Sequence, residues 1–205
     1  MKIVIATRNR HKAVELQTLL HGAGYDAVQL DEIDPDGKIP EVEETGTTFK
    51  ENALLKAHAI AKATGLPAIG DDTGLEVDAL GGAPGIFSAR YAGENCTYED
   101  NVKKLLRELS DVADDRRTAR FKTVAVYVHK ETELSAEGVV EGVITEKEEG
   151  VGGFGYDPVF SVLDMKKTYA QLADEEKNRV SHRGKAIRSL IEKLRENGLI
   201  ADNPS

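Results

Sequence analysis

The stretch KIVIATRNRHKAVELQTLL, residues 2–20, indicates the fold class. Its first part, KIVIA at 2–6, is a short continuous apolar run of the kind that forms a buried strand. Apolar residues then recur at helical spacing, at Ala13, Leu16, Leu19 and Leu20. A strand that passes through a polar turn into a helix is the unit from which α/β proteins are built.

Strand and helix patterns continue to mix along the chain. Further strands are expected at 25–30, 67–72, 119–130 and 134–145. Helices are expected from Thr47 or Thr48 to Gly65, from 98 to 110 and from 182 to 196. The connecting segments are expected to be a loop at 31–46, a turn at Thr73–Gly74, an ordered loop at 81–93 and a glycine hinge at 150–155.

These patterns predict a mixed α/β fold with a central mixed sheet. We expect residues 1–205 to form a single domain of two lobes, with a substrate cleft between the lobes. The second lobe is expected at roughly 115–160, where two strand patterns follow each other.

Composition excludes several classes of protein. Asp and Glu total 36 against 27 Lys and Arg, so a uniformly basic nucleic-acid surface is ruled out. Apolar runs stay far below the roughly 18 residues of a membrane span, and the start of the chain is too short in apolar residues for a signal peptide. With one cysteine, no internal disulfide can form. We therefore expect a cytoplasmic protein with no nucleic-acid or membrane partner.

The first candidate site is the turn that follows the first strand. At such a position free backbone N–H groups and the helix dipole favour anions. The turn consists of Thr7, Arg8, Asn9, Arg10, His11 and Lys12. It is not a Walker A loop, because the pattern GxxxxGK[ST] is absent. The alternative interpretation is a solvated, capped turn.

The second candidate is a set of carboxylates that could hold a hard cation such as Mg²⁺. The set comprises Glu41, Glu43, Glu44, Glu51, Asp71, Asp72, Glu76 and Asp78. Neighbouring side chains on a strand point to opposite faces, so we expect Asp71 and Asp72 not to chelate from one side. The alternative is an acidic turn beside a solvated acidic loop.

The third candidate is the glycine-rich segment GGFGYDP at 152–158. Its glycines let the backbone approach a ligand closely, and Phe154 and Tyr156 could stack on a base. Asp157 could accept a hydrogen bond from a base N–H group. The alternative is a tight hairpin with packed aromatic side chains.

The fourth candidate is a group of cations near the start of the last expected helix. It includes Lys177, His182, Arg183 and Lys185. Cations at a helix N-terminus are unfavourable unless an anion lies beside them. The alternative is a solvated basic face.

In this order and spacing, the chain resembles the inosine/xanthosine triphosphate pyrophosphatase family. The resemblance runs from about residue 3 to residue 195. It is carried by ATRNRHK at 6–12, ETGTTFKENALLKA at 44–57, GDDTGLEVDALGGAPGIFSARYAG at 70–93, FGYDPVF at 154–160 and KNRVSHRGKA at 177–186.

The resemblance implies a two-lobed Mg²⁺-dependent enzyme that usually works as a homodimer. It would hydrolyse purine nucleoside triphosphates such as dITP, ITP and XTP to the monophosphate and pyrophosphate. Asp72 would be the catalytic carboxylate and a metal ligand, with Thr73 beside it on the substrate. Glu41 would be the second metal ligand, and Glu44 is its rival because the alignment over 41–44 is loose.

By the same resemblance, the substrate contacts fall into two sets. Residues Thr7 through Lys12 would hold the triphosphate. The nucleoside and phosphate pocket would be lined by Phe154, Gly155, Tyr156, Asp157, Lys177, His182 and Arg183. Lys12, Lys56 and Lys177 would neutralise phosphate charge. One departure is visible, because Arg8 stands where the family commonly carries Gly.

Three other functions remain open at this stage. A related pyrophosphatase of the Maf-like group would prefer modified or pyrimidine triphosphates. Proteins of that group lack the SHR segment that this chain carries at 181–183. A nucleotide sensor would bind without turnover, so that Asp72 would be dispensable. A plain scaffold protein would show no rise in melting temperature with nucleotide.

Overall fold

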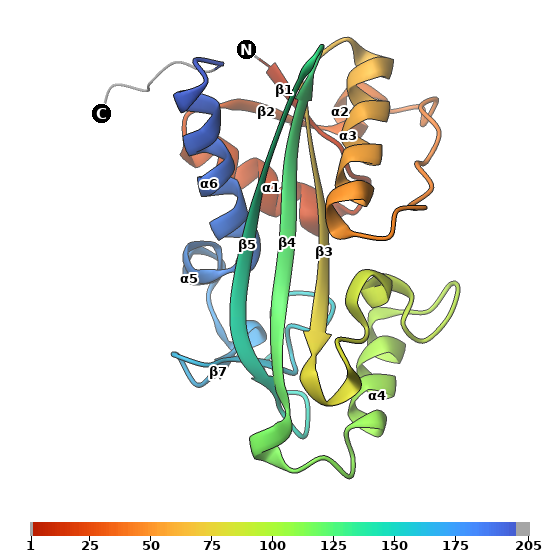
Figure 1. Ribbon diagram of the computed structural model, residues 1–205, viewed down its shortest axis with the longest axis vertical. Coiled ribbons are helices and arrows are strands. Elements are labelled where there is room, and N and C mark those ends of the chain that lie inside the picture. Colours follow the sequence, from red (N-terminus) through yellow and green to blue (C-terminus); the bar gives the residue numbers. More distant parts are fainter. Residues whose placement is uncertain (1, 200–205) are drawn as a thin grey trace. The chain divides into compact units, whose positions relative to one another are not determined.

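A computed structural model describes residues 2–199 and has a mixed α/β fold, as the sequence predicts (Figure 1). The strands are β1 (Lys2–Ile5), β2 (Asp26–Gln29), β3 (Ala68–Val77), β4 (Thr118–His129), β5 (Thr132–Ile144), β6 (Phe160–Val162) and β7 (Lys167–Thr168). The helices are α1 (Arg10–Gly22), α2 (Leu30–Ile33), α3 (Phe49–Thr64), α4 (Tyr98–Glu108), α5 (Asp174–Val180) and α6 (His182–Glu196). Within residues 2–199, no helix has both the length and the apolar content that crossing a membrane requires.

The strands form one sheet in the order β2-β1-β3-β4-β5-β6-β7. Strand β1 pairs in parallel with β2 and β3, whereas β6 pairs antiparallel with β5 and β7. The predicted mixed sheet is therefore confirmed.

The chain divides into two compact units. Among the described residues, unit 1 comprises 2–72, 123–138 and 183–199, and unit 2 comprises 73–122 and 139–182. Strands β3, β4 and β5 are long enough to contribute to both units, so the segment 115–160 is shared between them. The predicted division of 1–205 into two lobes with a cleft stays a prediction, and residues 1 and 200–205 lie outside the described part.

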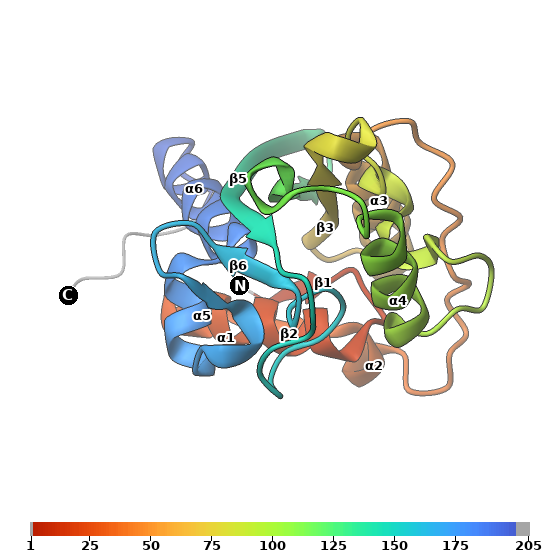
Figure 2. The same ribbon diagram turned by 90° about the horizontal axis from the view of Figure 1, so that it is seen from below.

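Unit 1 has helices on both faces of its strands, and the alternation of β1 shows why. Ile3 and Ile5 pack in a cluster with residues of α1 and α6, whereas Val4 packs in a cluster with Ile60 of α3. Helices α3 and α6 accordingly lie on opposite sides of the strands in both views (Figures 1 and 2). A strand covered on both faces is apolar throughout, which explains the continuous run IVI at 3–5.

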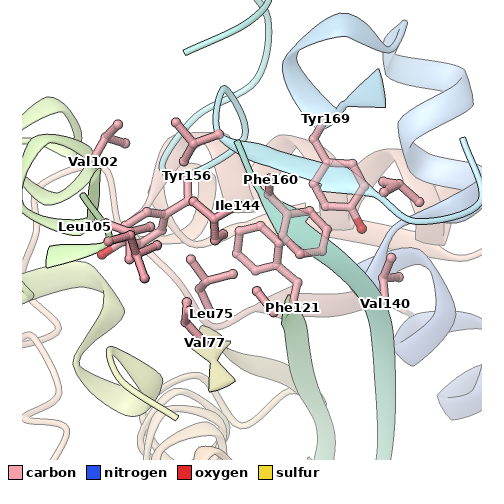
Figure 3. Close-up of a cluster of buried hydrophobic side chains, with 14 of the residues drawn as sticks. Leu75, Val77, Val102, Leu105, Phe121, Val140, Ile144, Tyr156, Phe160 and Tyr169 are labelled. Atoms are coloured by element: carbon pink, nitrogen blue, oxygen red, sulfur yellow. The ribbon is translucent and has the colours of Figure 1, made fainter. Parts of the chain in front are cut away.

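Unit 2 has a core of its own that is rich in aromatic rings (Figure 3). The ring of Phe121 lies edge-on to Phe160, with centroids 4.7 Å apart, and stacks on Tyr169 at 5.7 Å. Such pairs contribute beyond the area that they bury. In this unit, α4 and α5 lie on opposite sides of β6 (Figure 2).

Several boundaries differ from the sequence-based expectations. The turn expected at Thr73–Gly74 is wrong, because β3 continues through it to Val77. The strand is extended by packing, since Leu75 and Val77 are fully buried in the unit 2 core. The loop expected at 31–46 begins with α2, which the Gln29–Glu32 capping box stabilises. The short elements β6, β7 and α5 carry no periodicity long enough to predict them.

The longer elements are where the sequence places them. Thr48 caps α3 by accepting a hydrogen bond from Glu51 N, and Gly65 ends that helix with a positive φ of 69°. Helix α4, strands β4 and β5, and helix α6 lie within a few residues of the expected ranges.

Candidate active site

The turn after β1 is organised by its own side chains. Thr7 Oγ1 accepts a hydrogen bond from Asn9 N at 3.1 Å, and Asn9 Oδ1 accepts one from Lys12 N at 3.2 Å. Asn9 is thus the N-cap of α1. Arg10 and His11 are exposed in the first turn of the helix. The capped turn is therefore present, and it directs Lys12 to Asp71, with 3.8 Å between Nζ and Oδ2.

Arg8 is held by carboxylates of α2 and of the residue that follows it. Its guanidinium donates to Asp31 at 2.9 Å, to Asp34 at 2.6 Å and to the carbonyl of Ile39 at 3.0 Å. Hydrogen bonds from Ile39 N and then from Arg8 hold the pKa of Asp34 below its usual value. Arg8 therefore anchors the segment that follows α2, a role that the sequence pattern did not reveal.

Asp71 and Asp72 point to opposite faces of β3, as the alternation of a strand predicts. Asp71 Oδ2 lies 3.2 Å from Arg183 Nε, and it is also the atom that Lys12 approaches. Asp72 Oδ1 instead lies 3.6 Å from Nζ of Lys56 on α3. Both carboxylates are buried, at 1% and 5% exposure.

Lys56 connects Asp72 to a second carboxylate. Its Nζ lies 2.6 Å from Glu44 Oε1 as well as 3.6 Å from Asp72 Oδ1. The structure therefore brings Glu44 to the same ammonium group as Asp72, whereas Glu41 is exposed in the preceding loop.

Burial and the mutual charges of this cluster shift the pKa values of its members. Burial, with help from the charge of Lys56, lowers the pKa of Lys12, although Asp71 opposes the shift. Burial works against the charge of Lys56 too, but Asp72, Asp71 and Glu44 together raise the pKa of Lys56. Burial raises the pKa of Asp72, with Lys56 opposing it. The cluster thus places charged groups of both signs in a poorly solvated environment.

Protein carboxylates neutralise the cation at the start of α6. Arg183 is 2% exposed, and its guanidinium donates to Asp71 at 3.2 Å and to Glu15. These are the anions that the helix dipole makes necessary at this position. Sequence reasoning missed Glu15, although it lies three residues after Lys12 and so on the same face of α1.

In unit 2, Asp157 organises the glycine-rich segment. Its Oδ2 accepts a hydrogen bond from Lys177 Nζ at 2.7 Å and from Phe154 N at 2.8 Å. Lys177 Nζ also lies 4.8 Å from the centre of the Phe154 ring. Gly153 has a φ of 72°, and a Cβ there would lie 2.1 Å from Asp157 Oδ2, so this turn requires glycine.

The other predicted residues of unit 2 divide between core and site. Tyr156 is 4% exposed and its hydroxyl donates to the carbonyl of Ser88 at 2.9 Å, so its ring is part of the core. Gly155 has a positive φ of 63°, and Thr73 is half-buried on β3. His182 is 3% exposed and stacks on Phe121, with ring centroids 4.5 Å apart and an interplanar angle of 9°.

The donor chemistry around Lys56 fits a hard cation. Mg²⁺ is commonly held by one or two carboxylates plus water and substrate phosphate oxygens. Asp72 and Glu44 supply two such carboxylates, both directed to the same positively charged group. Within the described part of the chain, no group of three or more His, Cys, Asp or Glu side chains is arranged to hold a metal ion.

The position of this cluster defines the class of protein. Ile5 of β1 pairs with Ile69, so Asp71 and Asp72 lie just past the part of β3 that pairs with β1. Lys12 comes from the helix that follows β1. Ligands of open α/β sheets bind outside the carboxyl ends of parallel strands, so in this α/β protein the cluster lies where that class of fold carries its ligand sites.

Comparison with known proteins identifies the family. Residues 3–193 match the model of the Ham1 family. Proteins named dITP/XTP pyrophosphatase from Salmonella paratyphi A and Shigella flexneri are each 53% identical over 197 residues, which is 95% of this chain and 98% of theirs. The chain therefore belongs to the Ham1 family.

Solved structures agree with this assignment. The Staphylococcus aureus Ham1 protein has a TM-score of 0.83 and is 42% identical, covering 96% of this chain and 100% of that chain. A nucleoside-triphosphatase / dITP/XTP pyrophosphatase from Mycobacterium abscessus has a TM-score of 0.72 and is also 42% identical, covering 93% and 99%.

Proposed function

We propose that this protein hydrolyses non-standard purine nucleoside triphosphates, dITP, ITP and XTP, to the nucleoside monophosphate and pyrophosphate. Such a reaction removes deaminated purines from the nucleotide pool before they enter DNA or RNA. Relatives named for this activity span nearly the whole chain at 53% identity. The structural observation that carries the proposal is the ammonium of Lys56 between the carboxylates of Asp72 and Glu44.

We infer that the reaction requires Mg²⁺ and that Asp72 and Glu44 hold the ion. The contact of Glu44 with Lys56 favours it over Glu41 as the second ligand. When bound, the ion supplies charge neutralisation and polarises the attacked phosphorus. No covalent intermediate is needed, since a water molecule is the nucleophile.

The cations of unit 1 have a separate task in this mechanism. A triphosphate carries about four negative charges, which repel an attacking hydroxide and must be balanced in the transition state. Lys56, whose pKa the neighbouring carboxylates raise, provides a positive charge in a poorly solvated environment, where it acts more strongly than in water. Lys12 lies beside it in the same cluster, with its Nζ 3.8 Å from Asp71 Oδ2. Asp72 orients the attacking water and accepts its proton.

Base recognition is assigned to residues of unit 2. Phe154 offers a ring for stacking, and Lys177 and His182 carry N–H groups that can donate to the 6-oxo group of hypoxanthine or xanthine. Adenine presents a 6-amino donor instead, so donors facing it would be left unpaired. Such a buried mismatch costs about 1–3 kcal/mol for each group, which favours the 6-oxo purines.

The protein is further proposed to be a homodimer, as the family resemblance implies, and to be cytoplasmic. Light scattering coupled to gel filtration measures its mass directly, and twice 22.3 kDa is the expected value.

A panel of substrates tests the proposed function. ITP, XTP, dITP, GTP, ATP and dTTP are incubated with the protein, with Mg²⁺ and with the metal chelated by EDTA. We expect the first three to be hydrolysed fastest and only with Mg²⁺. Preference for dTTP would favour the Maf-like alternative, and binding without turnover of any substrate would favour a nucleotide sensor.

A further inference from the structure

Helix α3 carries a buried polar residue on its apolar face. Asn52 is 0% exposed, as are its helix neighbours Ala53 and Ala57. A buried side-chain amide is costly unless it is hydrogen-bonded. The contacts of Asn52 therefore show why this polar residue occupies a core position.

Two hydrogen bonds fix the orientation of the Asn52 amide. Gly46 N donates to Asn52 Oδ1 at 2.8 Å, and Asn52 Nδ2 donates to Asp72 Oδ2 at 3.3 Å. A backbone N–H can only donate, so Oδ1 must face Gly46. The NH₂ group must then face Asp72.

Asn52 and Lys56 together contact both carboxylate oxygens of Asp72. They lie four residues apart, on the same face of α3. Asn52 contacts Oδ2 of Asp72, and Lys56 contacts Oδ1 at 3.6 Å. The same two residues also hold the preceding loop, through Gly46 and through Glu44.

The close approach of the loop depends on glycine at position 46. A Cβ on Gly46 would lie 2.7 Å from Asn52 Oδ1 and 2.6 Å from Glu51 Cβ. Both distances are too short for a carbon atom, so any larger residue would push the loop away from the Asn52 amide.

We propose that Asn52 is a positioning residue for the reaction. Its amide fixes the direction in which Asp72 presents its carboxylate, and it sets the spacing between Asp72 and Glu44 by holding the loop through Gly46. This inference rests on the proposed function, because it gives the two carboxylates a shared task.

The expected size of the effect follows from other metal sites. Groups that orient metal ligands typically change metal affinity or activity by about 10–100-fold when they are removed. Substitution Asn52→Leu keeps the approximate volume and removes both hydrogen bonds. We expect kcat on dITP to fall by about tenfold or more, with KM changed by less than about threefold.

A matched control is available in unit 2. Asn101 on α4 is 2% exposed, accepts a hydrogen bond from Ala92 N at 2.7 Å and donates to the carbonyl of Ala89 at 3.1 Å. Like Asn52, it is a buried amide that ties a loop to a helix, but its partners are two backbone atoms and the Cys96 thiol, and none of them is a carboxylate. Asn101→Leu should lower the melting temperature while leaving kcat within about twofold.

A binding measurement complements the kinetics. The non-hydrolysable α,β-methylene analogue of dITP is titrated into each protein by calorimetry at several Mg²⁺ concentrations. For Asn52→Leu, we expect the Mg²⁺ concentration that gives half-maximal binding to rise by about tenfold. For Asn101→Leu it should match the wild type.

Gly46→Ala provides a second route to the same interaction. It should lower kcat in the same direction. Adding it to Asn52→Leu should cause little further loss, because the Gly46–Asn52 hydrogen bond that Gly46→Ala disturbs is already absent in Asn52→Leu. This variant keeps the test decisive if Asn52→Leu does not fold.

The outcomes separate this inference from the proposed function. If a folded Asn52→Leu or Gly46→Ala protein keeps the wild-type kcat and Mg²⁺ requirement, the role proposed for Asn52 is overturned and the proposed function is not. An equal loss of kcat in Asn101→Leu would also overturn it, because the effect would then be a general loss of packing. Failure of the wild-type protein itself to release pyrophosphate from dITP would overturn the proposed function.

Discussion

The two units bury polar groups in different ways. Unit 1 gathers cations and carboxylates side by side, with Lys56 between Asp72 and Glu44 and Arg183 on Asp71. Unit 2 places the Lys177–Asp157 ion pair beside aromatic rings, with the Lys177 ammonium 4.8 Å from the centre of the Phe154 ring. The first arrangement suits charge chemistry on phosphates, and the second suits recognition of a flat ring.

This contrast predicts that substitutions in the two units have different kinetic effects. Changes to the ionic cluster of unit 1 should act mainly on kcat, since they alter how charge is stabilised in the transition state. Changes to the aromatic site of unit 2 should act mainly on KM and on the choice of base.

Asp72→Asn should have the largest effect. It keeps the shape of the side chain but removes the charge that orients water and holds metal, so we expect kcat to fall by about 10³-fold or more. The variant should still bind the α,β-methylene analogue of dITP, which calorimetry can measure. Near-normal turnover would remove Asp72 from the mechanism.

Lys177→Met should cause the largest loss of stability. Lys177 and Asp157 are both buried, and removing one partner of such a pair costs about 3–5 kcal/mol. Lys12→Met in unit 1 should cost less, because Arg183 still neutralises Asp71. Thermal denaturation compares the two variants.

A double variant checks the cause of that loss. Lys177→Met combined with Asp157→Asn removes both charges and should regain much of the lost melting temperature. If the double variant is no more stable than Lys177→Met, the unpaired charge of Asp157 is not the cause.

Phe154→Ala should have an intermediate effect that is specific to binding. Stacking of a base on an aromatic ring contributes about 1–3 kcal/mol, so we expect KM for dITP to rise by about tenfold while kcat changes less. Steady-state kinetics measures both constants. A fall in kcat with an unchanged KM would break the contrast between the units.

Two helix caps offer the smallest and most closely matched comparison. Thr48 Oγ1 accepts from Glu51 N at 3.1 Å, and Thr97 Oγ1 accepts from Asp100 N at 3.1 Å. Each Thr→Ala substitution should cost about 1 kcal/mol of stability. Only Thr48→Ala should also lower kcat, by about twofold, because α3 carries Asn52 and Lys56. Equal kcat values for both variants would show that α3 tolerates this loss.

The sequence predicts the parts of this molecule that depend on local pattern. Apolar periodicity locates α3, α4, α6, β4 and β5, and Thr48 and Gly65 mark the ends of α3. The alternation of side chains on a strand places Asp71 and Asp72 on opposite faces. Each of these inferences requires only neighbouring residues.

Features that depend on distant partners were beyond this reasoning. Strand β3 continues past Thr73 because Leu75 is buried in the unit 2 core, and Tyr156 belongs to that core because its hydroxyl reaches Ser88. The partner of Arg183, Glu15, lies 168 residues away in the chain. Asn52 can be noticed in the sequence, because it is a polar residue that interrupts the apolar face of a helix. Its hydrogen-bond partners, Gly46 and Asp72, cannot be predicted from that pattern.

The central claim is that the protein removes pyrophosphate intact from a 6-oxo purine triphosphate. Phosphorus NMR of dITP incubated with the wild-type protein and Mg²⁺ tests it most directly, because the method distinguishes pyrophosphate from orthophosphate. The account predicts equal amounts of dIMP and pyrophosphate, with no dIDP. Accumulation of dIDP and orthophosphate would contradict it.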